Sequence, residues 1–286
     1  GEGADAQGCS RAQGYPADGC PQASEPGCPT LNPMSTVLGI DIGGSGVKGA
    51  PSDLEAGDFA ADRFRIETPE RSTPDNVVRI VGEIIDHFAD TLGDAPVGIT
   101  VPAPVRHGVT PMMANLDEAW EGLQADKFFA DKLGRSVTLV NDADAAGLAE
   151  VQYGAAKGTQ GVVILTTLGT GIGTAVINDG ILLPNTEFGH IEIDGHDAES
   201  RAAMSVKENE ELSWSEWAER LQRYYSELEK LLWPDLFVVG GGVSKKHEKF
   251  LPLLDLKTPI IPATLKNKAG IIGAAWLADQ QARTKR

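Results

Sequence analysis

The chain has 286 residues, 41% of them apolar, and its formal net charge at pH 7 is -16. This length allows one large hydrophobic core or two moderate ones, because domains usually span roughly 100 to 200 residues. The acidic balance argues against nucleic-acid binding, which usually needs a basic surface. No segment has the roughly 18 to 20 consecutive apolar residues that cross a bilayer, and no secretion signal opens the chain, so we expect a cytoplasmic protein that binds no membrane.

The first 34 residues differ in composition from the rest. Residues 1–34 are rich in Gly, Pro, Ser and Ala, show no apolar periodicity, and contain all three cysteines, Cys9, Cys20 and Cys28. Such a segment cannot bury enough apolar surface to form a core, so we expect a disordered extension. The cysteine spacings match no common zinc motif, which leaves a disulfide or a metal knot as the alternative.

The next part of the chain alternates strands and turns before its first helix. Short apolar or alternating runs predict strands over residues 37–42, 47–50, 59–66 and 96–101. The first three suggest an antiparallel meander. A helix follows from Pro74, with apolar residues at helical spacing up to Phe88, since proline is tolerated in a first turn.

The second half of the chain repeats this order. Strands are predicted over residues 137–140, 161–168, 174–177 and 236–239, and helices over 143–153, 215–232 and 270–278. A strand, a glycine turn and a second strand therefore occur twice. We predict an α/β protein of two related lobes, residues 35–140 and 141–269, with the closing segment 270–286 packed on the first lobe. A cleft between lobes is the default ligand site.

Each of the two lobes carries a glycine turn between strands. Asp41 opens the first turn, DIGGSGVKG, and Leu168 opens the second, LGTGIG. Glycines let backbone N–H groups approach a phosphate, Asp41 can hold Mg²⁺ through water, and Lys48 can reach phosphate oxygens. An ordinary hairpin with a surface lysine is the alternative. Neither turn matches a P-loop or a dinucleotide motif, and a pair of phosphate-binding turns fits a ligand bridging two lobes.

One aspartate follows a strand and opens a helix. Asp142 lies in NDADAAG, where a carboxylate could accept the proton of an attacking hydroxyl during phosphoryl transfer. Aspartate is also a favoured helix N-cap, so the sequence leaves a capping role equally open. Asp144 is the weaker candidate for the base.

Polar residues in two loops fit a carbohydrate. Glu187 and His190 of EFGH, followed by Glu192 and Glu199, could grip adjacent sugar hydroxyls, although a solvated acidic loop is the alternative. His190 has no second His or Cys at ligand spacing, which argues against a metal. The loop NLDEAW adds an amide and a carboxylate near the aromatic ring of Trp120. A tryptophan is found more often in a core than stacked on a sugar.

A third glycine run ends the strand predicted over 236–239. It begins a helix and could receive an adenosine or a phosphate chain. Six lysines against Glu248 and Asp255 then give the stretch 245–268 a local balance of +4, which could attract a polyanion. These lysines are Lys245, Lys246, Lys249, Lys257, Lys266 and Lys268.

The motifs DIGGSGVKG, NLDEAW, NDADAAG, LGTGIG, EFGH and VVGGGVS, in this order, resemble the ROK family of sugar kinases and repressors over residues 36–280. The resemblance implies two ribonuclease-H-like (actin-like) lobes that close on a hexose whose C6 hydroxyl attacks the terminal phosphoryl group. It implies Asp142 as the base. Sugar-binding positions would be Asn115, Asn141, Glu187, His190 and Glu199. Positions for phosphate, nucleotide and Mg²⁺ would be Asp41, Gly43, Gly44, Ser45, Lys48, Gly169, Thr170, Gly171, Gly240, Gly241, Gly242, Lys245 and Lys246, with Asp41 as the Mg²⁺ residue.

The chain departs from the wider family after EFGH. Many members carry a cysteine-rich zinc loop there, whereas residues 191–205 contain no cysteine, so we expect no structural zinc and a differently built loop around Glu199. This loop and the C-terminal third resemble the polyphosphate glucokinase branch.

That branch implies inorganic polyphosphate or ATP as donor, glucose and in second place mannose as acceptor, and a path for the polymer along Lys245, Lys246, Lys249, Lys266 and Lys268. The alternatives are a strictly ATP-dependent kinase, an actin-like ATPase, and a sugar-sensing regulator, which would need an N-terminal DNA-binding domain. A homodimer is compatible with all of them.

Overall fold

A computed structural model describes residues 36–113 and 115–284 of the chain. The predicted disordered extension, residues 1–34 with Cys9, Cys20 and Cys28, lies outside the described residues. Within the described ranges, every helix is too short or too polar to traverse a lipid bilayer.

The first half of the chain builds a mixed sheet whose strand order is β3-β2-β1-β5-β8. Its strands are β1 (Val37–Gly43), β2 (Gly46–Asp53), β3 (Asp58–Phe59), β4 (Phe64–Ile66), β5 (Val97–Val101) and β8 (Val137–Asn141). β2 pairs antiparallel with β1, β3 and β4, whereas β5 runs parallel to both β1 and β8. The fully buried β5 is an unbroken apolar and small-residue run, as expected for a parallel strand covered on both faces.

The second half builds a sheet of the same topology, β11-β10-β9-β14-β15. Its strands are β9 (Val162–Leu168), β10 (Ile172–Asn178), β11 (Ile181–Leu183), β14 (Leu236–Gly240) and β15 (Ile260–Pro262). Here too the hairpin strands are antiparallel, and β14 runs parallel to β9 and β15. The predicted two-lobe α/β fold with a repeated strand–turn–strand unit is confirmed.

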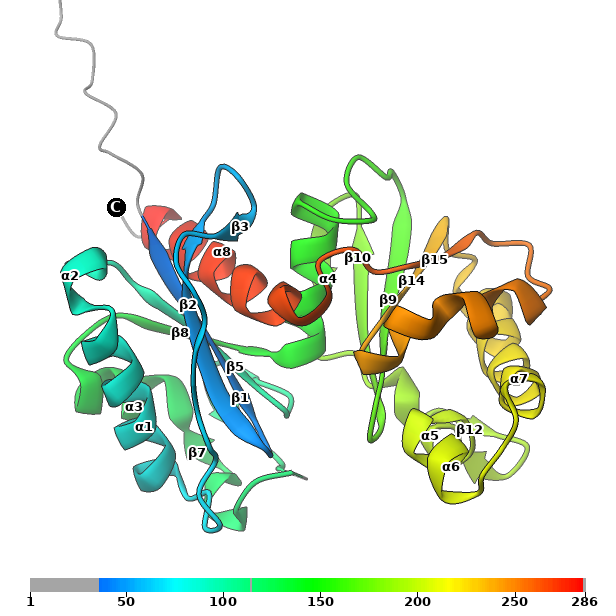
Figure 1. The fold of residues 1–286 in the computed structure, drawn as a ribbon, viewed down its shortest axis with the longest axis horizontal. Coiled ribbons are helices and arrows are strands. Elements are labelled where there is room, and N and C mark those ends of the chain that lie inside the picture. Colours follow the sequence, from blue (N-terminus) through cyan, green and yellow to red (C-terminus); the bar gives the residue numbers. More distant parts are fainter. Residues whose placement is uncertain (1–35, 114, 285–286) are drawn as a thin grey trace, which may run out of the picture. The chain divides into compact units, whose positions relative to one another are not determined.

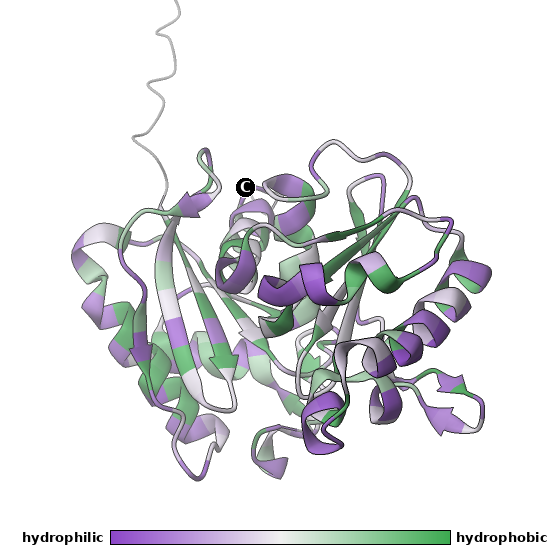
Figure 2. Cartoon of the chain, turned by 45° about the vertical axis from the view of Figure 1, so that its right-hand side comes forward, coloured by the Kyte–Doolittle hydropathy of each residue, from purple (hydrophilic) through white to green (hydrophobic). Residues whose placement is uncertain are grey.

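Helices cover both sheets, and their starts follow from local sequence. α1 (Pro74–His87) begins after Thr73, whose side chain accepts a hydrogen bond from the Asn76 amide, and α7 (Trp214–Leu232) begins with a capping box formed by Ser213 and Glu216. Two shorter helices, α2 (Ala89–Leu92) and α3 (Ala125–Leu133), complete the first half. Figure 2 shows the apolar residues concentrated in the strands and the hydrophilic ones on the outer helix faces.

Two helices are exchanged between the halves. α4 (Asp142–Gln152) follows β8 of the first sheet but packs on β9 and β10, whereas α8 (Ala269–Thr284) follows β15 of the second sheet but packs on β1 and β5. α4 and α8 also pack on each other, between the two sheets (Figure 1). They approach so closely that a Cβ on Gly273 would lie 1.8 Å from the Ala145 carbonyl oxygen.

The remaining elements are short and mostly belong to the second half. They are β6 (Val109–Thr110), η1 (Glu118–Trp120), β7 (Leu123–Gln124), η2 (Phe188–His190), β12 (Glu192–Ile193), β13 (His196–Asp197), α5 (Glu199–Ala202), α6 (Met204–Asn209), η3 (Gly242–Lys249), η4 (Leu251–Leu253) and η5 (Lys266–Lys268), where η denotes a 3-10 helix.

Two local expectations were wrong. The alternating stretch 59–66 is not one strand: β3 and β4 pair separately with β2, with a bend between them. The helix expected after the third glycine run is the 3-10 helix η3, which is kinked at Lys246 (φ -112°, ψ 21°). Hydrophobic alternation cannot reveal such a bend, since the residues on both sides of it keep the same pattern.

Candidate active site

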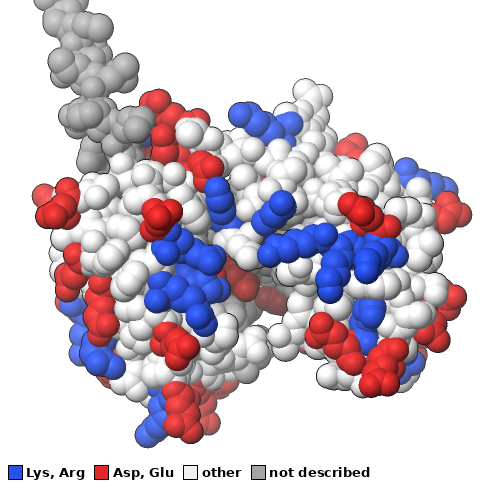
Figure 3. Space-filling model, in the orientation of Figure 1, with Lys and Arg blue, Asp and Glu red and all other residues white. Residues whose placement is uncertain are grey.

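A cavity of about 150 Å³ lies in the cleft between the two halves. It is lined by the end of β1, one face of α4 from Asp142 to Glu150, the N-terminus of α8, the strands β9 and β14 toward their ends, and the segment before α8. In the space-filling view of Figure 3, acidic atoms lie deep in this cleft and basic side chains stand along both of its rims. Five residues predicted from the sequence meet at the cavity: Asp41, Asp142, Gly240, Gly241 and Lys266.

Asp142 is the first residue of α4, and its neighbour caps the helix. The Asn141 side chain accepts hydrogen bonds from the Ala143 amide at 2.9 Å and the Asp144 amide at 3.1 Å, and its amide nitrogen donates to the Ala103 carbonyl. The capping role considered for Asp142 therefore belongs to Asn141. The Asp142 carboxylate accepts a hydrogen bond from the Ala143 amide, at 2.8 Å, and the side chain lines the cavity.

The protonation of Asp142 is tuned by its surroundings. Burial raises the pKa of its carboxyl to about 6, the negative charges of Asp41 and then Glu187 add to the rise, and the Ala143 amide opposes it. A carboxylate of this pKa holds a proton more strongly than ordinary aspartate while remaining largely ionised at neutral pH. These are the properties of a general base.

Asp41 lies opposite in the same cavity. Its Oδ1 accepts a hydrogen bond from the Thr100 hydroxyl at 2.8 Å, and its Oδ2 lies 3.4 Å from the Lys48 ammonium group, its cross-strand partner. Two carboxylates, Asp41 and Asp142, thus share one small cavity. Hard carboxylate oxygens suit Mg²⁺, and a divalent cation there would relieve the repulsion between them, so these residues fit the ion.

The second glycine turn is held by residues that come later in the chain. Glu199 Oε2 accepts from the Ile172 amide at 3.0 Å, and a Cβ on Gly171 would lie 2.4 Å from this oxygen. Ser205 of α6 donates its amide to the Gly169 carbonyl and its hydroxyl to the Thr170 carbonyl. The loop that carries Glu199 is therefore locked to the predicted phosphate turn.

The third glycine run has one position that only glycine fits. Gly241 has φ 80°, and a Cβ there would lie 2.4 Å from the Leu168 carbonyl oxygen, so β14 and the second glycine turn touch backbone to backbone. Gly169 and Gly242, in contrast, have no atom within 4 Å of a would-be Cβ. These open sides leave room for a ligand against the backbone.

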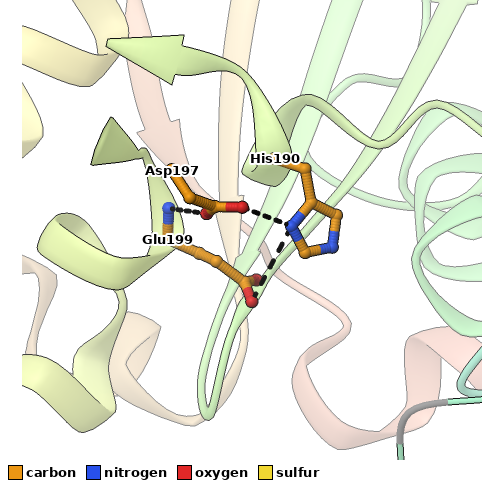
Figure 4. Close-up of side chains that lie close together, drawn as sticks. All are labelled: His190, Asp197 and Glu199. Carbon is orange, nitrogen blue, oxygen red and sulfur yellow. Dashed lines mark hydrogen bonds and ion pairs between the residues drawn. The ribbon is translucent and has the colours of Figure 1, made fainter. Parts of the chain in front are cut away.

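His190 belongs to a cluster with Asp197 and Glu199 (Figure 4). Its Nδ1 lies 2.9 Å from Asp197 Oδ2 and 4.0 Å from Glu199 Oε1, and Asp197 Oδ1 also accepts from the Glu199 amide. The hydrogen bond to Asp197 raises the pKa of the imidazole, and the nearby charges of Glu199 and Glu187 add to this rise. With Nδ1 engaged, the Nε2 atom is the one left for a substrate.

The sequence analysis missed Asp197. It reaches His190 because β12 and β13 form a hairpin whose turn, Asp194-Gly195, has positive φ at both residues, 54° and 77°. Arg223 of α7 fixes this turn through two hydrogen bonds to Asp194, at 2.9 and 3.0 Å. An Asp-Gly pair between short apolar runs is a hairpin signal and could have revealed the fold-back.

The same three residues could also be considered as metal ligands. His190, Asp197 and Glu199 offer ligand atoms that lie within 4.8 Å of one another. However, Nδ1 of His190 is already bonded to Asp197, and one Glu199 oxygen is bonded to a backbone amide. The contacts of the three residues form a hydrogen-bonded network within the protein.

The other predicted sugar positions lie on both sides of the cleft. Glu187 precedes η2 and is exposed. The pKa of its carboxyl is raised, chiefly because the group is partly removed from water; the charge of His190 opposes this rise, and the charge of Glu199 adds to it. Asn115 is exposed, and its carbonyl oxygen lies 3.6 Å from a would-be Cβ on Gly44, beside the first glycine turn. Trp120 is fully buried and donates its indole N–H to Ser72, so it belongs to the core as expected.

Asp144, the weaker candidate for the base, is buried away from the cavity. Its Oδ2 accepts from the Asn185 amide at 2.8 Å, and Asn185 bonds to both backbone groups of Val105 in the first half. Burial raises the pKa of Asp144 to about 7. The hydrogen bond from the Asn185 amide opposes this rise, and the negative charges of Glu187 and Asp142 add to it. Its contacts link the halves and do not face the cavity lining.

Glu150 is a second residue that the sequence analysis missed. It is 1% exposed, lines the cavity, and accepts from the amides of Ala155, Thr264 and Leu265. A buried carboxylate satisfied by several amides is a rigid anchor. Glu150 therefore fixes the segment before α8 that brings Lys266 to the cavity.

The lysines predicted to form one path are in different places. Lys266 lines the cavity, and Lys268 forms an ion pair with Asp58. Lys246 and Lys249 lie over the Trp214 ring. Lys245 is exposed and forms no ion pair within the described ranges.

Comparisons with known proteins identify the family of the chain. The model of the ROK family matches residues 37–204. The polyphosphate glucokinase of Mycobacterium tuberculosis (strain H37Rv) is 48% identical over 239 residues, which cover 83% of this chain and 89% of that protein. The polyphosphate glucokinase of Mycobacterium leprae has the same identity over 73% of its length.

Solved structures extend the likeness to the fold. The crystal structure of inorganic polyphosphate/ATP-glucomannokinase from Arthrobacter sp. strain KM superposes with a TM-score of 0.82 at 47% identity, and covers 86% of this chain and 99% of that one. A ROK family glucokinase from Streptomyces griseus, in complex with glucose and AMPPNP, has a TM-score of 0.73 at 24% identity and supports the fold alone. With a family match over more than half of its length and relatives at 48% identity, the chain belongs to the ROK family.

Proposed function

We propose that this protein is a hexose kinase that transfers a phosphoryl group from inorganic polyphosphate or ATP to the C6 hydroxyl of glucose. Mannose is the second acceptor to test. The observation that carries the proposal is the Asp142 carboxylate, which has a raised pKa and shares with Asp41 a cavity that Gly240 and Gly241, at the end of β14, also line. The named relatives, two polyphosphate glucokinases and a glucomannokinase, support the donor and the acceptor.

The proton transfer follows from the position of Asp142. As the C6 oxygen of the sugar forms a bond to the terminal phosphorus of the donor, the bond from that phosphorus to the next bridging oxygen breaks. The Asp142 carboxylate accepts the C6 hydroxyl proton, and the shortened donor leaves with the electron pair of the broken bond. Mg²⁺, when bound, supplies neutralisation of the phosphate charge, and Asp41 would hold it through water.

The binding groups divide between the two substrates. Glu187, His190 and Glu199 bind sugar hydroxyls from the second half, and Asn115 reaches the sugar from the first half, with Asn141 beside the base. The backbone amides of the three glycine runs bind donor phosphates, together with Lys48 and Lys266. Acceptors and donors thus converge on the cleft from two sides, and closing of the lobes would exclude water from the reacting atoms.

The experiment that tests the proposal compares two aspartates of α4. We expect Asp142→Asn to lower kcat by about 10²- to 10⁴-fold, as for loss of a general base, while glucose still binds. Asp144→Asn keeps an oxygen that can accept the Asn185 amide, and its kcat should fall by less than about tenfold. Initial rates and glucose titrations by calorimetry give both quantities.

The pH dependence provides the second part of this test. Because Asp142 must be ionised to accept a proton and its pKa is raised to about 6, kcat/KM of the unaltered enzyme should fall as pH drops through that value. A residual activity of Asp142→Asn close to the unaltered enzyme, or equal losses in both variants, would contradict the assignment. Assays with glucose or mannose, each with ATP or nucleotide-free polyphosphate, then decide the donor and the acceptor and separate a strictly ATP-dependent kinase.

A further inference from the structure

Three lysine side chains converge on one indole ring away from the cleft cavity. The ammonium nitrogens of Lys207, Lys249 and Lys246 lie 4.5, 5.5 and 5.9 Å from the centre of the Trp214 ring. We call these four residues the Trp214 cluster. Basic side chains gather over η3 in Figure 3, the segment drawn in orange in Figure 1.

The ring at the centre of the cluster is held firmly. Trp214 is the first residue of α7, directly after the N-cap Ser213, and its ring stacks on Phe250 at 6.0 Å and meets the edge of Trp217 at 5.9 Å. Phe250 and Trp217 are both fully buried. The lysines come from two other elements, Lys207 from α6 and the other two from η3, so the fold and not one helix face brings the charges together.

The positive charge of the cluster is not balanced by the protein. Among the described residues, no carboxylate oxygen lies within 4.0 Å of these three ammonium groups, whereas Lys268 and Lys230 have acidic partners. The Lys207 ammonium group donates to the Leu212 carbonyl, and cation–π attraction contributes about 0.5–1 kcal/mol for each exposed lysine. Like charges still repel one another, and a chain of net charge -16 could have supplied acids here. A multivalent anion would complete this arrangement.

Short segments connect the cluster to two of the three glycine runs. Ser205 of α6 binds the carbonyls of Gly169 and Thr170, and Lys207 comes two residues later. η3 begins at Gly242, next to the cavity-lining Gly241. At a rise of about 2 Å per residue in a 3-10 helix, the backbones of Lys246 and Lys249 lie roughly 8 and 14 Å along the chain from Gly242.

We propose that the Trp214 cluster is a second donor subsite, which binds phosphate units of inorganic polyphosphate beyond those held in the cleft. The inference rests on the proposed function, in which the polymer is a donor. A nucleoside triphosphate continues beyond its phosphates as an uncharged nucleoside, which offers nothing to three ammonium groups. The cluster therefore acts on long polyphosphate and not on ATP.

The experiment uses the full chain carrying Lys207→Gln and Lys249→Gln together, compared with Lys257→Gln. Lys257 is the matched control because its ammonium nitrogen also lies over an indole ring, 5.6 Å from the centre of Trp233. KM is measured for long-chain polyphosphate, tripolyphosphate and ATP at saturating glucose. Binding of long-chain polyphosphate without sugar is measured by calorimetry at several salt concentrations, and thermal unfolding checks that each variant is folded.

We expect the double variant to raise KM and Kd for the long polymer by about tenfold, and to reduce the slope of log Kd against log salt by about 1.4, since two phosphate contacts are lost and each contributes roughly 0.7 for a single-stranded polyanion. The effect should be confined to the long polymer, and Lys257→Gln should match the unaltered enzyme. Equal changes for tripolyphosphate and the long polymer, or an unchanged Kd for the long polymer, would overturn the subsite.

The outcomes separate this inference from the proposed function. If the unaltered protein binds long polyphosphate and the double variant does not, the subsite stands, even where no phosphoryl transfer from the polymer is detected and the proposed donor is wrong. If the unaltered protein transfers phosphoryl groups from the polymer and the double variant binds it equally well, the donor stands and the subsite fails.

Discussion

The two glycine turns that follow β1 and β9 join antiparallel strands in the same way but differ in charge. Asp41 is the last residue of β1 that pairs with β5, and Thr167 is the last residue of β9 that pairs with β14. Both residues line the same cavity. The first turn brings a carboxylate and a lysine, and the second brings neutral hydroxyls and glycine amides. The repeated unit thus supplies two turns of similar backbone, while the charged side chains, Asp41 and Lys48, belong to one of them.

The halves differ also in the connection that leads away from the hairpin. In the first sheet, α1 and α2 lead from β4 to β5, whereas in the second the chain between β11 and β14 contains η2, the β12–β13 hairpin and the helices α5, α6 and α7. His190, Glu199 and the Trp214 cluster all lie in or beside this longer connection. The proposed sugar site and the proposed polymer subsite therefore lie in or beside segments that the first half lacks, on a sheet of the same topology.

The largest expected effect comes from removing the charge of Asp41, and the comparison is with a change at Thr167, its neutral counterpart in the second sheet. Asp41→Asn should lower kcat by about 10²- to 10³-fold and raise the Mg²⁺ concentration needed, whereas Thr167→Val should change kcat by less than about fivefold. Because the Asp41 charge helps to raise the pKa of Asp142, the acid limb of the pH profile should move to lower pH in Asp41→Asn. Comparable losses in both variants would show that the turns are chemically equivalent.

The next effect tests how the halves are joined. In Gly273→Ala the added Cβ meets the Ala145 carbonyl at 1.8 Å, so α4 and α8 must separate, and we expect the free energy of unfolding to fall by about 1–3 kcal/mol. Gly82→Ala is the control, since its Cβ would have only an ordinary contact, 3.7 Å from Leu133, and should stabilise α1 by up to about 1 kcal/mol. Urea unfolding of both variants measures the difference, and an unaffected Gly273→Ala would mean that the helices can move apart freely.

The smallest effect concerns the added sugar loop. Asp197→Asn removes the charge that holds His190 Nδ1, so the imidazole pKa should fall toward its usual value and the glucose KM should rise about threefold to tenfold with little change in kcat. An NMR titration of His190 and steady-state kinetics give the two numbers.

Asp194→Asn in the same hairpin is the control, because it weakens the contact with Arg223 and leaves the His190–Asp197 pair in place. If this variant raised the glucose KM equally, the position of the hairpin and not the orientation of the imidazole would be the cause.

The strands and the duplicated unit could be predicted because their signals are local. Val37 to Ile42 and Leu236 to Val239 are apolar runs ended by glycines, and the structure has strands there. The competition between Asn141 and Asp142 for the N-cap could not be decided in this way, since both residue types are favoured caps. Only the backbone geometry shows that Asn141 takes the cap and Asp142 faces the cleft.

The lysines that follow one another in the basic stretch 245–268 lie in different places in the structure. The basic stretch 245–268 suggested one path, but Lys268 pairs with Asp58, Lys257 lies over Trp233, and the lysines of η3 turn toward Trp214. Lys207 joins them from another element, although no other basic residue stands within five positions of it in the sequence. Long-range folding decides such groupings, so residue spacing alone cannot reveal them.

The exchange of α4 and α8 has a consequence for the integrity of the chain. A fragment ending at Asn141 would retain every strand of the first sheet but leave Gly39 and Gly98 without α8, the helix that packs on them, and the complementary fragment would hold α8 with only α4 left to pack on. The first sheet therefore gains its covering helix only from the end of the chain. A chain cut between the halves would have to reassemble before that sheet is fully covered.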